Sequence, residues 1–291
     1  MTHHMTQVNG VRLHYAEAGE GEPVLLLPGW PQDWYAWRKM VPLLVAQHRR
    51  VIVLDPRGYG ESDKPASGYD LDTAATDVHG FLAAAGLDRP GGIDVVTHDL
   101  GAWIGYALAS AHPGDVRRLV IGEVTIPDPN ATTPIPDEAA NIKSWHVAFN
   151  RLPDLPEALM QGREGVFLNW LFDHKAAQPA KIDPAARDEY VRAFSTPGTM
   201  VAFLSYYREA FGAAGLKRMG ERRATPLPMP VLTVGGKEGI GEMLDKSFQG
   251  LATNVQSVQL DGCGHYIPEE CPAEFMGAID SFWRSAPAKM R

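Results

Sequence analysis

The chain has 291 residues, of which 45% are apolar and 21% are charged, so its composition is that of a globular protein with enough apolar side chains for a large core. A formal net charge of −8, without a long run of Lys or Arg, argues against nucleic acid and anionic membranes as partners. Neither a membrane-length apolar stretch nor a signal peptide is recognisable, and with only two cysteines, Cys263 and Cys271, we expect buried, reduced thiols in a cytoplasmic protein.

The first 125 residues alternate between predicted strands and predicted helices. Asn9-Gly10 is the favoured two-residue turn of a hairpin, and short continuous apolar runs are typical of strands that are buried on both faces. The expected elements are, in chain order, a hairpin at residues 8–15, a strand at 23–27, a helix at 35–47, a strand at 51–54, a helix at 71–85, a strand at 93–98, a helix from about residue 101 and a strand at 118–124. Strands that alternate with helices indicate a parallel sheet covered on both faces.

The pattern changes after residue 125. Residues 126–225 predict helices but no convincing buried strand, and proline-rich connectors, one of which contains Pro134, mark both ends of this segment. We therefore expect a core formed by residues 1–125 and 226–291, with an all-helical insertion at 126–225. In the second part of the core, strands are expected at 231–236 and 255–260 and a last helix at 272–283.

One acid stands at the junction of a strand and a helix. The apolar run ends at His98, a helix rich in small residues follows, and Asp99 lies between them, with Thr97 and Gly101 two residues away on either side. Slim residues at those positions permit the sharp strand-to-helix turn called a nucleophile elbow, which raises the residue at its apex above the edge of the sheet. The positive end of the helix dipole favours an ionised carboxylate at that apex.

Four short motifs follow predicted strands. They are residues 28–31 (Pro-Gly-Trp-Pro), 55–62 (Asp-Pro-Arg-Gly-Tyr-Gly-Glu-Ser), 98–101 (His-Asp-Leu-Gly) and 262–265 (Gly-Cys-Gly-His). In this order they resemble the alpha/beta hydrolase fold and, within it, the epoxide hydrolases. The resemblance implies a mostly parallel eight-stranded sheet with helices on both faces, an inserted helical cap, and chemistry that needs no cofactor and no metal.

An aspartate at the elbow points to substitution at a saturated carbon. Attack by a serine would give an ether, whereas attack by a carboxylate gives an ester that water can cleave. By resemblance, Asp99 is the nucleophile and His265 is the base that activates water. The backbone N–H groups of Trp30 and Leu100 would form the oxyanion hole. The family usually has His where this chain has Pro28, a change that leaves the backbone donors in place.

Two positions are open for the acid that orients His265 and stabilises its cation. Glu123 ends the strand that follows the elbow, and Glu238 follows a later strand, where many members of the family have Asp. The subgroup that resembles the cystic fibrosis transmembrane regulator inhibitory factor uses a Glu after the earlier strand, and residues 123–128 and 262–271 look like that subgroup. We favour Glu123 over Glu238.

An opened epoxide leaves a negatively charged oxygen that needs a donor on the face opposite Asp99. In the resembling subgroup a His and a Tyr from the cap supply this donor. The matching residues here are His146 and Tyr207, with Tyr206 as the adjacent alternative. The other interpretation is that His146 and Tyr207 only pack inside the cap. The aromatic cap suggests an apolar or aromatic small-molecule epoxide. The expected substrate-binding residues are Trp30, Trp103, Trp145, Phe149, Trp170 and Tyr206.

Two other functions remain open. Haloalkane and haloacetate dehalogenases use the same ester chemistry, but the first place Trp and the second Arg directly after the nucleophile, where this chain has Leu100. A binding protein on a retained hydrolase scaffold is the third hypothesis, and intact Asp99 and His265 argue against it. A homodimer is neither indicated nor excluded by the sequence.

Overall fold

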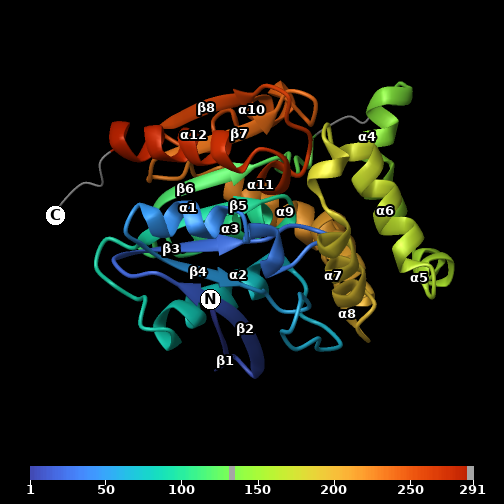
Figure 1. The fold of residues 1–291 in the computed structure, drawn as a ribbon, viewed down its shortest axis with the longest axis horizontal. Helices are drawn as coiled ribbons and strands as arrows, with labels where there is room; N and C mark the ends of the chain where they lie inside the picture. Colours follow the sequence, from blue (N-terminus) through green and yellow to red (C-terminus); the bar gives the residue numbers. More distant parts are fainter. Residues whose placement is uncertain (131–134, 287–291) are drawn as a thin grey trace.

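The computed structural model describes residues 1–130 and 135–286, so Pro134 and residues 287–291, the last five of the predicted core, lie outside the described residues. One eight-stranded sheet organises these residues, in the order β1-β2-β4-β3-β5-β6-β7-β8 (Figure 1). Only β1–β2 and β2–β4 pair antiparallel, which confirms the mostly parallel sheet expected from the resemblance. The strands are β1 (Thr2–Val8), β2 (Val11–Ala18), β3 (Glu22–Leu27), β4 (Arg49–Leu54), β5 (Ile93–His98), β6 (Val116–Gly122), β7 (Val231–Gly236) and β8 (Val255–Leu260).

The burial of the strands explains their sequence patterns. Residues 24–27 of β3 and 51–54 of β4 are fully buried, because helices cover both faces of the parallel part of the sheet. The edge strand β1 is mostly exposed and joins β2 through Asn9 and Gly10, whose φ angles of 47° and 83° fit the tight turn that their sequence predicts.

The helices of the core form two layers. Helices α1 and α12 pack together over one face of the sheet, and α2 packs on α3 over the other. The predicted helix at 35–47 is instead a short 3₁₀ helix followed by α1, because Pro42 has no N–H for an i→i−4 bond and fits only the first turn of a helix. The core helices are η1 (Trp34–Trp37), α1 (Met40–Ala46), α2 (Leu71–Ala84), α3 (Leu100–Ala111), α10 (Glu242–Phe248), α11 (Ile267–Glu270) and α12 (Pro272–Ser285).

Between β6 and β7 the described residues 126–130 and 135–225 form helices and loops without a strand. Asp137 and Asp183 cap the starts of two of these helices, each by accepting a backbone N–H of the first turn. Figure 1 shows α4 to α8 beside the sheet, at the side where the parallel strands end. The helices of this segment, called the cap below, are α4 (Glu138–Phe149), α5 (Leu155–Met160), α6 (Glu164–Lys175), η2 (Pro179–Lys181), α7 (Pro184–Phe194), α8 (Thr199–Phe211) and α9 (Ala213–Arg223).

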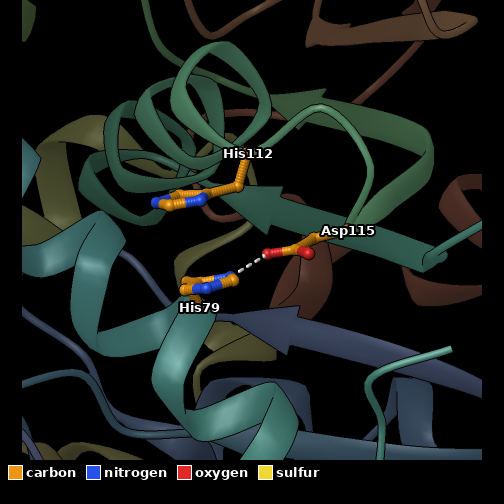
Figure 2. Close-up of side chains that lie close together, drawn as sticks. All are labelled: His79, His112 and Asp115. Carbon is orange, nitrogen blue, oxygen red and sulfur yellow. Dashed lines mark hydrogen bonds and ion pairs between the residues drawn. The ribbon is translucent and has the colours of Figure 1, made fainter.

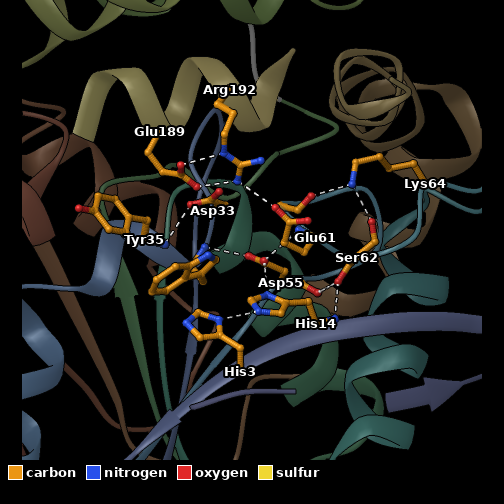
Figure 3. A network of polar contacts seen from close by, with 12 residues as sticks. His3, His14, Asp33, Tyr35, Asp55, Glu61, Ser62, Lys64, Glu189 and Arg192 are labelled. Carbon is orange, nitrogen blue, oxygen red and sulfur yellow. Dashed lines mark hydrogen bonds and ion pairs between the residues drawn. The ribbon is translucent and has the colours of Figure 1, made fainter. Parts of the chain in front are cut away.

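The loop after β4 joins the cap to the core (Figure 3). On the core side Asp55 is fully buried, accepts the backbone N–H of Trp34 at 2.8 Å and contacts the His14 ring at 2.7 Å. On the cap side Arg192 of α7 binds Glu61 of the same loop at 2.9 Å. The loop is thus held from both sides. No helix in the described residues is both long and apolar enough to cross a membrane.

Candidate active site

Asp99 occupies the apex of a sharp turn between β5 and α3. Its φ of 49° and ψ of −126° lie outside the regions that an aspartate usually adopts, and its backbone N–H donates to the carbonyl of Gly122 at 2.9 Å. A Cβ atom on Gly101 would lie 2.3 Å from the carbonyl oxygen of Pro28. Only glycine therefore fits two residues after the apex, which is the elbow geometry predicted from the sequence.

The two carboxylate oxygens of Asp99 have different partners. Oδ1 accepts the backbone N–H of Trp30 at 2.8 Å, and Oδ2 lies 3.4 Å from Nε2 of His265. The side chain is 5% exposed, so this carboxylate is held almost without water. In the part of the chain that the structure describes, the Leu100 N–H makes no hydrogen bond to Asp99, so the second donor of the predicted oxyanion hole stays a prediction.

Glu123 stands on the far side of the His265 ring. Its Oε2 lies 3.3 Å from Nδ1 of His265, while its Oε1 accepts the backbone N–H of Gly236 at 2.6 Å. The Ile240 N–H adds a third contact at 3.2 Å, and the carboxylate is completely buried. Glu238 is exposed, and Lys143 of the cap donates to its backbone carbonyl at 2.6 Å. Of the two candidate acids, Glu123 is the one beside the histidine.

The charges at this site shift one another's ionisation. Burial alone would raise the pKa of Asp99, but the contact with His265 and the positive charge of Lys175 outweigh it and hold that pKa below its usual value. Burial and Lys175 both act to lower the pKa of His265, and the Asp99 and Glu123 carboxylates outweigh them and raise it. Asp99 is consequently an ionised carboxylate at neutral pH.

The loop that carries His265 is fixed from three directions. The backbone N–H of His265 donates to the carbonyl of Lys175 at 3.1 Å. Burial lowers the pKa of His98 to about 4, so its ring is neutral, and its Nε2–H donates to the carbonyl of His265 at 2.7 Å. Cys263 and Cys271, on either side of His265, form a disulfide.

The disulfide corrects the sequence-based prediction of two reduced thiols. Cysteine count and compartment led to that prediction, whereas the deciding factor is that the turn into α11 brings Cys263 and Cys271 to a Cα–Cα distance of 6.1 Å. Since disulfides persist mainly in oxidising compartments, one of the observations on which the cytoplasmic expectation rested no longer holds.

The two predicted cap donors meet at the Trp30 ring. His146 of α4 stacks on this indole with centroids 5.1 Å apart and 4° between the planes, and Tyr207 of α8 meets it edge-on at 5.7 Å. Both side chains are buried. Burial raises the pKa of the Tyr207 hydroxyl well above its usual value, so this hydroxyl keeps its proton. The backbone N–H of the same tryptophan binds Asp99, so Trp30 contacts both the carboxylate and the two cap side chains.

Lys175, the last residue of α6, is a member of this group that the sequence did not reveal. It is 5% exposed, its Nζ lies 3.4 Å from Nε2 of His146, and the ammonium is 5.9 Å from the centroid of the Trp30 ring. Lysine is common in the last turn of a helix, where it complements the dipole in water, and this explains why the pattern gave no signal.

The predicted substrate-binding residues separate into two groups. Trp103 packs edge-on against Tyr207 at 5.5 Å, while Trp145 packs against Phe149 and Trp170 at 5.4 Å each in a half-buried aromatic cluster of the cap. Phe167 joins that cluster to Trp30 at a centroid distance of 6.0 Å.

Tyr206 is the exception among the predicted substrate-binding residues. It donates its hydroxyl to the carbonyl of Arg57 at 3.1 Å, and it packs against Tyr59 and Tyr69. Successive residues of a helix point about 100° apart, which is why Tyr207 faces Trp30 and Tyr206 faces the loop after β4. Tyr206 is therefore not among the side chains gathered at Asp99.

A second polar cluster lies at the opposite end of α3 (Figure 2). Nδ1 of His79 is 2.7 Å from Oδ2 of Asp115, and the rings of His79 and His112 stack with centroids 4.0 Å apart and 5° between planes. The three side chains are close enough to consider a shared metal ion. An ion must lie in the plane of each imidazole that binds it, and two parallel stacked rings do not share such a point. This arrangement suits a histidine–aspartate hydrogen bond rather than a metal site.

Comparison with known proteins gives consistent results. Residues 22–272 match the family described as alpha/beta hydrolase fold. The soluble epoxide hydrolase of Corynebacterium sp. (strain C12) is 34% identical over 279 residues, which is 94% of this chain and 93% of that protein. Among solved structures, Cfl2 from Burkholderia cenocepacia is similar with a TM-score of 0.90 at 35% identity, covering 97% of this chain and 95% of that one. The epoxide hydrolase CorEH is similar with a TM-score of 0.89 at 31% identity, covering 98% and 99%.

Proposed function

The chain belongs to the alpha/beta hydrolase fold family, and within it we propose that it is an epoxide hydrolase that opens an epoxide to a vicinal diol through an ester formed on Asp99. The observation that carries the proposal is the placement of Asp99: one of its oxygens accepts the Trp30 N–H, and among the described residues the His265 ring is the one hydrogen-bond donor near the other. Relatives named as epoxide hydrolases over nearly the whole chain support the substrate class.

The first half of the proposed reaction forms the ester. Oδ2 of Asp99 attacks one epoxide carbon, the carbon–oxygen bond of the ring breaks, and the electron pair goes to the epoxide oxygen. His146 and Tyr207, on the cap side of Trp30, donate to that oxygen. General acid assistance of this kind contributes about 10²- to 10⁴-fold to a rate.

The second half releases the product. His265 takes a proton from water, and the resulting hydroxide adds to the carbonyl carbon of the ester. The bond from that carbon to the diol oxygen then breaks, and the diol oxygen takes the proton from His265. The negative charge that develops on the ester oxygen is stabilised by the Trp30 N–H and, in this proposal, by the Leu100 N–H. Glu123 holds the imidazole through Nδ1 and stabilises its cation.

The proposal assigns residues 126–225 the role of a cap over a core of residues 1–125 and 226–291. Asp99, His146 and Tyr207 are each at most 5% exposed, so a substrate reaches Asp99 only when the cap moves or its side chains rearrange. Phe167 packs against Trp30 and in turn against Trp145, and this series of aromatic side chains favours an apolar or aromatic epoxide.

The experiment that tests this proposal traps the ester. Replacement His265→Gln removes the base but leaves Asp99 in place, so the variant should form the ester and fail to break it. Intact-mass measurement after mixing with styrene oxide should show protein plus one substrate, and peptide mapping should place the added mass on Asp99. Formation of diol by the parent without release of halide from matched haloalkanes and haloacetates supports an epoxide hydrolase. Halide release without diol would favour the dehalogenase alternative.

A further inference from the structure

Lys175 is a buried positive charge to which the proposed mechanism gives no role. In the described residues no carboxylate lies within ion-pair distance of its Nζ, and the one hydrogen-bond partner of that atom is Nε2 of His146 at 3.4 Å. An isolated charge held away from water is costly unless it interacts with something specific. The backbone of Lys175 is itself fixed, because its carbonyl accepts the N–H of His265 at 3.1 Å.

The contact with Lys175 decides which nitrogen of His146 carries the proton. An ammonium group has three donors and no acceptor, so Nε2 of His146 must be the acceptor of this hydrogen bond. Burial and the charge of Lys175 lower the pKa of His146 well below its usual value, so the ring is neutral and carries its single proton on Nδ1. Nδ1 of His146 is buried and has no partner in the described part of the protein.

An unpartnered Nδ1–H at this position is a donor ready for a substrate oxygen. We propose that Lys175 acts through His146 as a positioning residue and proton source for the opening of the epoxide, an inference that rests on the function proposed above. Lys175 fixes the tautomer that presents Nδ1–H, and it replaces the proton that His146 gives away.

The proton balance of this step requires such a source. When the carbon–oxygen bond breaks, the proton on Nδ1 of His146 moves to the epoxide oxygen. A neutral imidazole that only lost this proton would become an anion, but transfer of a proton from Nζ of Lys175 to Nε2 keeps the ring neutral. Lys175 is then an uncharged amine. Ester hydrolysis leaves the Asp99 carboxyl with one proton more than its starting carboxylate. That proton returns to Nδ1 of His146 while the Nε2 proton passes back to Nζ of Lys175, which restores both the tautomer and the ammonium.

The surroundings of Lys175 suit a group that gives up a proton near neutral pH. Burial lowers its pKa to about 8, against the opposite effect of Asp99 and Glu123. Several titratable groups act on Lys175 or are acted on by it. They are Asp99, Glu123, His98, His146 and His265. Below about pH 8 the lysine is an ammonium that can donate, and above that value it is an amine that cannot.

The test measures ester formation separately from ester hydrolysis. In the His265→Gln background the appearance of the adduct with styrene oxide is followed by intact mass between pH 6 and pH 10. Adding Lys175→Met, which keeps an unbranched apolar stem of similar length, should slow adduct formation about 10²-fold and remove the decline in rate above pH 8. Lys181→Met, at an exposed lysine of the cap, is the matched control and should leave rate and profile unchanged.

A second variant separates the proton source from a structural role. Lys175→Arg keeps the positive charge and a donor but does not release its proton in this pH range, so it should form the adduct more slowly than the parent and without the decline above pH 8. A rate in Lys175→Met within about twofold of the parent, or an unchanged alkaline decline in either variant, would overturn the role of Lys175.

Failure of the proposed function has a different signature. Absence of any adduct in His265→Gln, tested over terminal and internal epoxides, would overturn the ester mechanism and with it this role of Lys175. The tautomer is measured independently of activity, by ¹⁵N chemical shifts of the His146 ring in the parent protein. The proton should reside on Nδ1 at pH 7, and in Lys175→Met that preference should be lost. A proton on Nε2 in the parent would contradict the inference directly.

Discussion

Strand β5 has a buried aspartate near each of its ends, and the two are used in opposite ways. Asp94, the second residue of the strand, is fully buried and is bound by Arg49, Arg117 and Arg118, the last two through paired contacts of 2.7 to 3.0 Å. Asp99, just after the strand, is almost as buried but receives one backbone N–H and one distant imidazole.

The two carboxylates differ in how many hydrogen-bond donors contact their oxygens. Both oxygens of Asp94 are occupied by guanidinium donors, so this acid is stabilised and inert. Within residues 1–130 and 135–286, no donor lies closer than 3.4 Å to Oδ2 of Asp99, so one lone pair is available to attack a substrate. The contrast teaches that burial alone does not make a carboxylate reactive; what matters is how many of its lone pairs are left without a hydrogen-bond donor.

The largest expected effect comes from removing the reactive acid. Asp99→Ala should lower the rate of diol formation by at least about 10⁴-fold, because no other group forms the ester. Its melting temperature should not fall, since the variant removes a buried charge from a turn that is strained in either case. Activity is measured by diol formation and stability by thermal unfolding. Full activity in Asp99→Ala would refute the assignment of the nucleophile.

Asp94→Asn should have the opposite effect to Asp99→Ala: the protein should lose stability and keep its activity. Loss of the charge leaves three buried or half-buried guanidinium groups without their common partner, and we expect the free energy of unfolding to fall by about 3 to 5 kcal/mol while kcat stays within about twofold. Denaturant unfolding and steady-state kinetics measure the two quantities. Asp280→Asn, at the surface pair with Arg284, is the control and should change stability by less than about 1 kcal/mol. A large loss of kcat in Asp94→Asn at full stability would break the comparison.

Removal of the disulfide tests how much it contributes to holding the loop that carries His265. Replacing Cys263 and Cys271 together by Ser opens a short loop and should lower the free energy of unfolding by about 2 to 3 kcal/mol. The His265 backbone keeps its bonds to His98 and Lys175, so we expect activity to fall less than about tenfold. Treatment of the parent with a reductant should reproduce both changes, and an unchanged melting temperature after proven reduction would contradict this expectation.

The smallest expected effect is the dependence of stability on acid. Burial acts to raise the pKa of Asp94, but the arginines outweigh it and lower that pKa from 3.8 to about 2. A carboxylate with a lower pKa in the folded state stabilises the protein above pH 4, and this contribution, about 2 kcal/mol, is lost as the pH falls from 4 toward 2. Asp94→Asn should show that much less loss of unfolding free energy over the same interval. If the unfolding free energy of parent and variant fell equally between pH 4 and pH 2, the arginines would not depress the pKa of Asp94.

The sequence predicted the strand-to-helix turn at Asp99 because its cause is local: an apolar run, a slim residue on either side and a helix. The continuous apolar runs between helices predicted a parallel sheet covered on both faces, whereas its eight strands were implied by the resemblance to the alpha/beta hydrolase fold. The position of Glu123 beside His265 was one of two alternatives, because the choice depends on which loop approaches the ring.

What the sequence did not reveal depends on contacts between distant segments. The pairing of Cys263 with Cys271 follows from the turn into α11, and the burial of Lys175 follows from the way α6 packs against the His265 loop. Tyr206 and Tyr207 are chemically alike and adjacent, and only the rotation of α8 decides which of them faces Trp30. Patterns of residue type along a chain carry no direct record of such packing.

The central claim is that Asp99 itself bonds to the substrate, and a single turnover in heavy-oxygen water tests it most directly. With enzyme in excess over styrene oxide, the incoming water oxygen should appear in the carboxylate of the peptide that contains Asp99, and the first diol should carry no label. Label in the diol and none in Asp99 would mean that water attacks the epoxide directly, which would contradict the account.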